Sequence, residues 1–160
     1  MVRVGLGTDS HAFEEDGTKP LVLGGVKLSE CDGLKARSDG DVVLHALFNA
    51  ISQACGGESI GYYADEMCDR GIMDSREYLK LALEMVRGMG YRINNIGIMV
   101  EAKRPCVAVE DSRRMKRSIA RLAEISDAEV GITYTSGEEL TSFGRGEGVY
   151  VQAVVSIVKA

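Results

Sequence analysis

The chain has 160 residues, the usual length of one domain, which is enough to bury a real core. Its formal net charge is −5, so it lacks the basic character typical of nucleic-acid-binding proteins. There is no apolar run of membrane-spanning length, no signal-peptide pattern and no CxxC pair among four cysteines, so we predict a single cytoplasmic domain, residues 1–160, with no membrane contact and no cysteine-held zinc.

The first half of the chain is predicted to contain a strand, a hairpin and a buried helix. Residues 2–7 form an apolar strand, and residues 21–23 and 26–28 flank Gly24-Gly25, a two-residue hairpin signal. Ser38 is predicted as the N-cap of a helix, with Asp41 three residues later, and residues 42–54 are apolar on nearly every face. This helix ends at Gly56-Gly57, and residues 58–73 are predicted to be an irregular loop, either functional or mobile.

The second half alternates helices with strands. A capping pattern at residues 74–77 starts a helix that ends at Gly88 and Gly90, and residues 93–101 form a strand. Residues 110–125 form a further helix, and residues 130–134 and 148–158 the last two strands. The basic residues of the 110–125 helix predict a solvated face, with a polyanion site as the minority hypothesis: Arg113, Arg114, Lys116, Arg117 and Arg121.

This order of elements predicts an α/β (α+β) two-layer sandwich, a mixed sheet with the helices on one face. The other sheet face then needs cover. Residues 148–158 are apolar on both sides of the strand, which suggests a subunit interface against the bare face and hence an oligomer.

Asp9, His11 and His45 are candidate metal ligands. Asp9 and His11 are two residues apart, so both point to one side of a strand, and His45 lies early in the first helix. One carboxylate and two imidazoles suit zinc, with a fourth position open for chemistry. The alternative is a satisfied core histidine beside a polar strand end.

Two later stretches carry weaker signals. Thr135, Ser136 and Glu138 follow a strand, where hydroxyls and a carboxylate can contact phosphate oxygens and a hard cation, although an ordinary turn explains them equally well. Arg145 lies between glycines before the last strand, where it could fork onto a phosphate or pair with a glutamate of another subunit.

Five motifs carry a resemblance to a known family: Asp-x-His at 9–11, Gly-Gly-Val at 24–26, Ser-Asp-Gly-Asp-Val-x-x-His at 38–45, Asp-Ser-Arg at 74–76 and Gly-Arg-Gly-Glu-Gly at 144–148. Over nearly its whole length the chain resembles 2-C-methyl-D-erythritol 2,4-cyclodiphosphate synthase of the non-mevalonate isoprenoid pathway. The resemblance implies a homotrimer with its sheets facing a central axis and three active sites at subunit interfaces. The implied reaction is intramolecular: the 2-phosphate of the cytidine diphospho substrate attacks the β-phosphorus, CMP leaves and a cyclic diphosphate forms.

The resemblance also implies roles for individual residues. It places Zn²⁺, or another divalent transition metal, on Asp9, His11 and His45, and Mg²⁺ or Mn²⁺ between the phosphates and Glu138. It assigns the cytidine to residues 102–108, the erythritol part to the loop from Ser59 to Asp65, and a phosphate to Arg145. The implied catalytic residues are Arg37 and Ser136, and the implied substrate contacts are Asp9, Ser10, His11, Arg37, Ser38, Ser59, Ile60, Gly61, Asp65, Ala102, Lys103, Pro105, Cys106, Thr135, Ser136, Glu138 and Arg145.

Several of these positions depart from the family pattern, which usually has His at 37, Asp at 49 and 59, Phe-Pro at 63–64, Lys at 106 and Thr at 136. This chain has Arg37, Asn49, Ser59, Tyr63-Ala64, Cys106 and Ser136 there. A second hypothesis is therefore a divergent trimeric relative that keeps the metal but binds or acts on another phosphorylated ligand. A zinc hydrolase is disfavoured, because no spare His or Glu beside the triad is placed as a general base.

Overall fold

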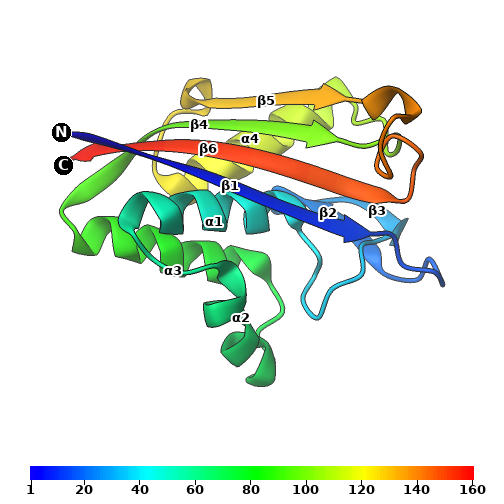
Figure 1. The fold of residues 1–160 in the computed structure, drawn as a ribbon, viewed down its shortest axis with the longest axis horizontal. Coiled ribbons are helices and arrows are strands. Elements are labelled where there is room, and N and C mark those ends of the chain that lie inside the picture. The colour runs from blue at the N-terminus through cyan, green and yellow to red at the C-terminus, as the bar shows by residue number, and fades with distance from the viewer.

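The fold has two layers, a four-stranded mixed sheet and a set of helices on one of its faces (Figure 1). The structure is a computed structural model and describes all of residues 1–160. The strand order is β1-β6-β4-β5, in which β4 and β5 run parallel and the other pairs antiparallel. The strands are β1 (Val2–Ala12), β4 (Tyr91–Glu101), β5 (Val130–Thr135) and β6 (Gly148–Lys159). The predicted mixed α+β architecture, with helices on one sheet face, is confirmed.

The helix layer covers the face of the sheet on which the core lies. Every second residue of β6, from Val149 to Ile157, is fully buried against it. No helix is both long enough and apolar enough to cross a membrane. The helices are α1 (Val42–Cys55), α2 (Ile60–Asp69), α3 (Ser75–Gly88) and α4 (Val109–Ala123), with short 3₁₀ turns at Asp127–Glu129 and Gly137–Glu139.

Helix α1 packs directly onto β1 because two glycines leave room for it. A Cβ on Gly5 would stand 1.9 Å from the carbonyl oxygen of Ala50, and one on Gly7 would stand 2.2 Å from that of Ala46. Only glycine therefore allows this approach of strand and helix backbones. The contact places the first turn of α1 beside the last residues of β1.

A separate two-stranded hairpin joins β2 (Pro20–Leu23) to β3 (Val26–Asp32) through Gly24 and Gly25. Both glycines have positive φ, 60° and 74°, as a two-residue hairpin turn requires. Their backbone N–H groups donate to the two carboxylate oxygens of Asp41, at 2.8 and 2.6 Å. The predicted hairpin is confirmed, and Asp41 anchors it to the start of α1.

Three sequence predictions are corrected by the structure. The first strand continues past residue 7 to Ala12, since it pairs along its whole length with β6. The N-cap of α1 is Asp41, whose side chain accepts from the Leu44 N–H, while the Ser38 hydroxyl accepts from Gly40 inside the preceding turn. Residues 58–73 are not an irregular loop, because they contain α2.

Three basic residues of α4, Arg113, Arg114 and Arg117, form ion pairs with acidic residues of the same helix. Arg114 contacts Asp111 at 2.8 Å, and Arg117 contacts Glu110 at the same distance. These exposed pairs are those of a solvated helix face, as the sequence predicted for these residues.

Candidate metal centre and adjoining cleft

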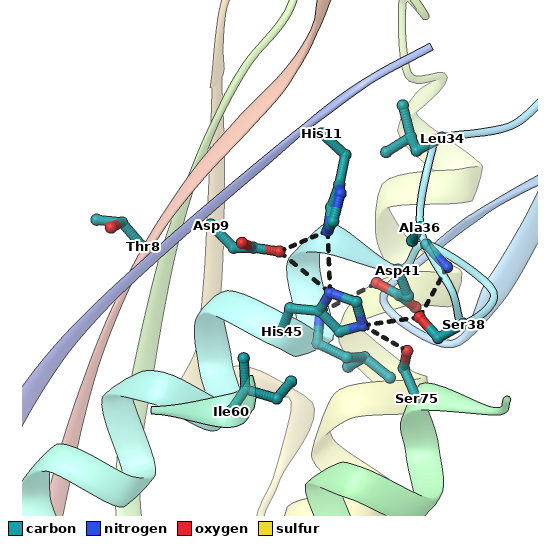
Figure 2. Close-up of polar contacts among 12 residues, drawn as sticks. Thr8, Asp9, His11, Leu34, Ala36, Ser38, Asp41, His45, Ile60 and Ser75 are labelled. Carbon is teal, nitrogen blue, oxygen red and sulfur yellow. Dashed lines mark hydrogen bonds and ion pairs between the residues drawn. The ribbon is translucent and has the colours of Figure 1, made fainter. Parts of the chain in front are cut away.

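Asp9, His11 and His45 come together where the end of β1 meets the first turn of α1 (Figure 2). Asp9 Oδ2 lies 2.9 Å from His11 Nε2 and 3.1 Å from His45 Nδ1, and the two histidine nitrogens are 3.2 Å apart. The strand alternation that the sequence predicted puts Asp9 and His11 on the helix-facing side of the sheet. One atom from each of the three side chains therefore converges on a single point.

The protonation of this cluster reflects its partial burial. Burial raises the pKa of Asp9, but hydrogen bonds and Coulombic attraction to His11 and His45 outweigh it and bring that pKa to about 2. The hydrogen bond to Asp9 raises the pKa of His11 against the opposing effect of burial, and a backbone hydrogen bond at Lys35 raises it further. Asp9 is thus held as a carboxylate, the charge state in which it would bind a cation.

The donor set fits a tetrahedral divalent ion. Ligand atoms at about 2.1 Å from such an ion stand roughly 3.4 Å from one another. The three atoms here lie 2.9–3.2 Å apart, so a shift of a few tenths of an ångström would open the position for an ion. Two imidazole nitrogens and one carboxylate oxygen are ligands that zinc and similar transition metals prefer.

The far side of the His45 ring contacts two serine hydroxyls, of which the sequence assigned Ser38 to the site but not Ser75. His45 Nε2 lies 2.8 Å from the hydroxyl of Ser75 and 3.3 Å from that of Ser38. The Ser75 hydroxyl also donates to Asp39. Ser75 is the first residue of α3, and the pattern Asp74-Ser75-Arg76 suggested only a helix cap and a family motif.

A cleft lies beyond the ends of β4 and β5, and it gathers most of the residues predicted to hold cytidine. Its floor is apolar, and its rim is formed by the loop after β4 and the end of β5. It shares no residue with the metal cluster. The lining residues are Leu23, Val100, Ala102, Lys103, Pro105, Cys106, Val107, Tyr134, Thr135, Ser136 and Val149.

Other predicted substrate contacts lie around the start of α2. Ser59 borders a polar hollow together with Thr8 and Asn49. The Ile60 N–H donates to the Asn49 side-chain oxygen at 2.9 Å, which ties α2 to α1. Gly61 lies in the first turn of α2, where a Cβ would meet no neighbour.

Arg37 points at α2 and not at the metal cluster. Its guanidinium lies 2.5 Å from Asp69 and 3.6 Å from Asp65, both on α2. The predicted residues Arg37 and Asp65 are therefore brought together. Ser10 lies on the opposite face of the sheet from Asp9 and His11, because side chains alternate along β1.

Glu138 and Arg145 lie in the turns between β5 and β6, outside the metal cluster. The Ser136 hydroxyl donates to the Glu138 carboxylate at 3.3 Å and accepts from its N–H at the same distance. Arg145 pairs with Glu147 of its own chain at 3.1 Å. Within one chain, the predicted residues thus form three groups: the metal cluster, the residues around α2, and the cleft with its neighbouring turns.

Comparison with known proteins identifies relatives along the whole chain. Residues 2–158 match the sequence model of the YgbB family. A protein of Chlamydia muridarum named 2-C-methyl-D-erythritol 2,4-cyclodiphosphate synthase is 42% identical over 161 residues, which covers 99% of this chain and 89% of that protein.

Solved structures share the fold. The bifunctional IspDF from Campylobacter jejuni superposes with a TM-score of 0.88 at 36% identity; the match covers 98% of this chain and 42% of that longer one. A 2C-methyl-D-erythritol-2,4-cyclodiphosphate synthase in its CDP-bound form gives a TM-score of 0.83 at 29% identity, covering 98% of this chain and 100% of the other.

Proposed function

The chain belongs to the YgbB family, and on that premise we propose that it converts 4-diphosphocytidyl-2-C-methyl-D-erythritol 2-phosphate to 2-C-methyl-D-erythritol 2,4-cyclodiphosphate and CMP. It would thus be a phosphorus–oxygen lyase of isoprenoid biosynthesis. The observation that carries the proposal is the convergence of Asp9, His11 and His45 in a chain whose curated relatives bear this name over 99% of its length.

The reaction asks for positioning and charge neutralisation more than for a side-chain nucleophile, because the attacking phosphate belongs to the substrate. Asp9, His11 and His45 would hold zinc or another divalent transition metal, and Glu138 would hold Mg²⁺ or Mn²⁺ together with the substrate. When bound, such ions supply positive charge that offsets the charge spreading over the diphosphate.

The remaining residues of the proposed site bind and orient the substrate. The cleft beside Ala102, Pro105 and Cys106 would hold the nucleoside. The solved relative in a CDP-bound form supports a cytidine nucleotide as a ligand. The Ser136 hydroxyl lies on the cleft rim, where it would orient the leaving phosphate. The start of α2, from Ser59 to Gly61, would hold the erythritol part.

We propose that the active site is completed in a homotrimer. The metal cluster and the cleft share no residue in one chain, and the bare sheet face exposes four apolar side chains, Val2, Val4, Leu6 and Val154. Packing three sheets around an axis would bury that face and set the metal cluster of one subunit beside the cleft of the next. Arg145 would then lie near the axis, as a phosphate contact.

The cytoplasm is the proposed location. The cysteines support it, because all four carry free thiols and a reducing compartment keeps them so.

A divergent relative with another phosphorylated ligand is the second candidate. Cys106 lies exposed on the cleft rim where the family pattern has a lysine, so this position carries no cation and Lys103 is the one basic residue that lines the cleft. This single position weakens the expected recognition of the nucleotide, whereas the metal cluster is complete.

Release of CMP from the cytidine diphospho substrate tests the proposal. Purified protein supplied with zinc and magnesium should release CMP, and His45→Ala should release none and bind less transition metal. The absence of CMP at any substrate concentration, from an intact trimer that binds zinc, would favour the divergent relative. Equal, near-zero metal content in both proteins would overturn the metal site itself.

A further inference from the structure

Both ring nitrogens of His45 have polar partners, which are candidate metal ligands on one side and serine hydroxyls on the other (Figure 2). Its Nδ1 faces Asp9 and His11. Its Nε2 faces the Ser75 hydroxyl at 2.8 Å, with the Ser38 hydroxyl further away at 3.3 Å. Both His45 and Ser75 are buried, so no bulk water competes for these contacts.

The other hydrogen bonds of Ser75 show which atom donates in its contact with His45 Nε2. The Ser75 hydroxyl has a single proton, and its close contact with the Asp39 carboxylate uses it, because a carboxylate can only accept. The backbone N–H of Ser75 donates to the other Asp39 oxygen at 3.0 Å, which fixes the carboxylate in place. The Ser75 oxygen then has only a lone pair left for His45, so His45 Nε2 must be the donor.

We propose that Ser75 and Asp39 act as a positioning pair that holds His45 in the Nε2–H tautomer, with its Nδ1 lone pair aimed at the metal position. The proposal rests on the metal site of the proposed function and adds two residues to it. A hydrogen bond passed on to a carboxylate raises the basicity of the ligating nitrogen as well as orienting the ring. Ser38 is the weaker partner, because its contact is longer and its oxygen already accepts from Gly40.

The fold explains why this pair is available. The Asp39 N–H donates to the Met73 carbonyl at 2.9 Å, so the loop before α1 is joined to the start of α3. Ser75 is the first residue of α3 and is 1% exposed. A pair that only stabilised the fold would leave the tautomer of His45 unchanged, whereas a positioning pair fixes it.

The tautomer of His45 is therefore the first measurement. The chain has only two histidines, so ¹⁵N-detected imidazole spectra of the metal-free protein at pH 8 contain two sets of signals, which His11→Gln assigns. We expect neutral His45 to carry its proton on Nε2 in the wild-type protein. In Ser75→Ala the proton should shift toward Nδ1, where Asp9 can accept it. A wild-type His45 protonated on Nδ1 would overturn the proposal.

Zinc affinity gives the second measurement, by competition with a chelator. Ser75→Ala should weaken zinc binding 10- to 100-fold. Ser52→Ala is the matched control, because Ser52 is equally buried and its hydroxyl donates to the Glu58 carbonyl, away from the cluster. Unchanged affinity in a folded Ser75→Ala protein would overturn the positioning role alone, whereas a wild-type protein that binds no metal would overturn the proposed metal site.

Discussion

Asp41 is a buried carboxylate that joins the hairpin turn to the start of α1 through three backbone N–H groups. It caps α1 through the Leu44 N–H and accepts the N–H groups of Gly24 and Gly25 in the hairpin turn. Burial raises its pKa from the ordinary value of 3.8 to about 6, although these hydrogen bonds favour the charged form. The side chain therefore fixes the geometry of the hairpin and the helix, at the cost of a charge held out of water.

The stability of the protein should depend on the ionisation of Asp41. A carboxylic acid whose folded pKa is raised contributes stability that is fully present below pH 3.8 and is lost as the pH rises through about 6. Asp41→Asn has no such ionisation, but its amide cannot accept from Gly25 as the carboxylate does. The unfolding free energy of Asp41→Asn minus that of the wild-type protein should therefore rise by roughly 2–3 kcal/mol between pH 4 and pH 7. Urea unfolding of the chelator-treated proteins measures this, and a difference independent of pH would contradict it.

Cys106 should limit nucleotide affinity. A lysine at this exposed position on the cleft rim adds a charged hydrogen-bond donor, worth roughly 1.5–3 kcal/mol where it is used. Cys106→Lys should therefore lower the Michaelis constant about 10- to 100-fold. Turnover should stay nearly unchanged, because the added contact stabilises the bound substrate and the transition state equally. Steady-state kinetics checks this. Cys31→Lys is the control, because Cys31 is exposed on β3 outside the cleft, and an equal effect of both variants would contradict the assignment.

At the scale of elements, α2 depends on contacts with other segments. Only Ala64 and Cys68 of α2 are buried, and its N-cap Ser59 makes no side-chain capping hydrogen bond. Arg37 reaches it from the loop before α1 and pairs with Asp69 and Asp65. This arrangement makes Arg37 a link between the loop before α1 and the helix whose start is proposed to hold the erythritol part.

Loss of Arg37 should loosen α2 without unfolding the protein. Exposed ion pairs contribute about 0.2–1 kcal/mol, so Arg37→Ala should speed amide hydrogen exchange across residues 60–69 by about two- to fivefold. Arg70→Ala is the matched control, because Arg70 pairs with Glu66 inside the same helix and does not reach the loop. Equal exchange in wild type and Arg37→Ala, measured by mass spectrometry, would show that the link carries no stability.

Sequence patterns predicted the elements that bury a broad apolar face and missed the one that does not. Helices α1, α3 and α4 have sustained apolar stripes, whereas α2 buries two residues one turn apart and contains Gly61. The N-cap was misplaced because Ser38 and Asp41 both suit that position, and only the hairpin contacts of Asp41 decide between them.

The candidate metal ligands could be predicted from the two-residue spacing of Asp9 and His11 and from the rarity of histidine in the chain. Asp9 and His11 share a strand face, and His45 is the one other histidine. The contact of His45 with Ser75 spans 30 residues and depends on how α3 meets α1, so no local pattern indicates it. The resemblance implied that Arg37 is a catalytic residue and a substrate contact, and its pairing with α2 likewise depends on tertiary packing.

At the scale of the whole molecule, the bare sheet face should hold three copies together. Val154 lies at its centre on β6, beside Leu6 of β1 and Gly97 of β4, and is 44% exposed. We expect light scattering to give three times the chain mass of 17.3 kDa at micromolar concentration, because an exposed apolar patch of this kind marks an interface.

Val154→Asp should shift that mass toward the monomer, since it would bury a carboxylate without a partner. Val109→Asp is the control, because Val109 is exposed at the start of α4, away from the sheet face. A monomer mass for the wild-type protein would rule out the trimer, and an intact trimer of Val154→Asp would place the interface elsewhere.

The close approach of α1 to β1 at Gly5 and Gly7 also fixes the distances among the candidate metal ligands. Ordinary contact needs at least 3.4 Å, so even one methyl group there would drive α1 away from β1 by more than an ångström. His45 would travel with the helix while Asp9 and His11 stayed with the strand, and metal–ligand bonds tolerate only about 0.2 Å. The spacing between β1 and α1 therefore sets the metal affinity, and a substitution that widens it would weaken metal binding before it unfolded the core.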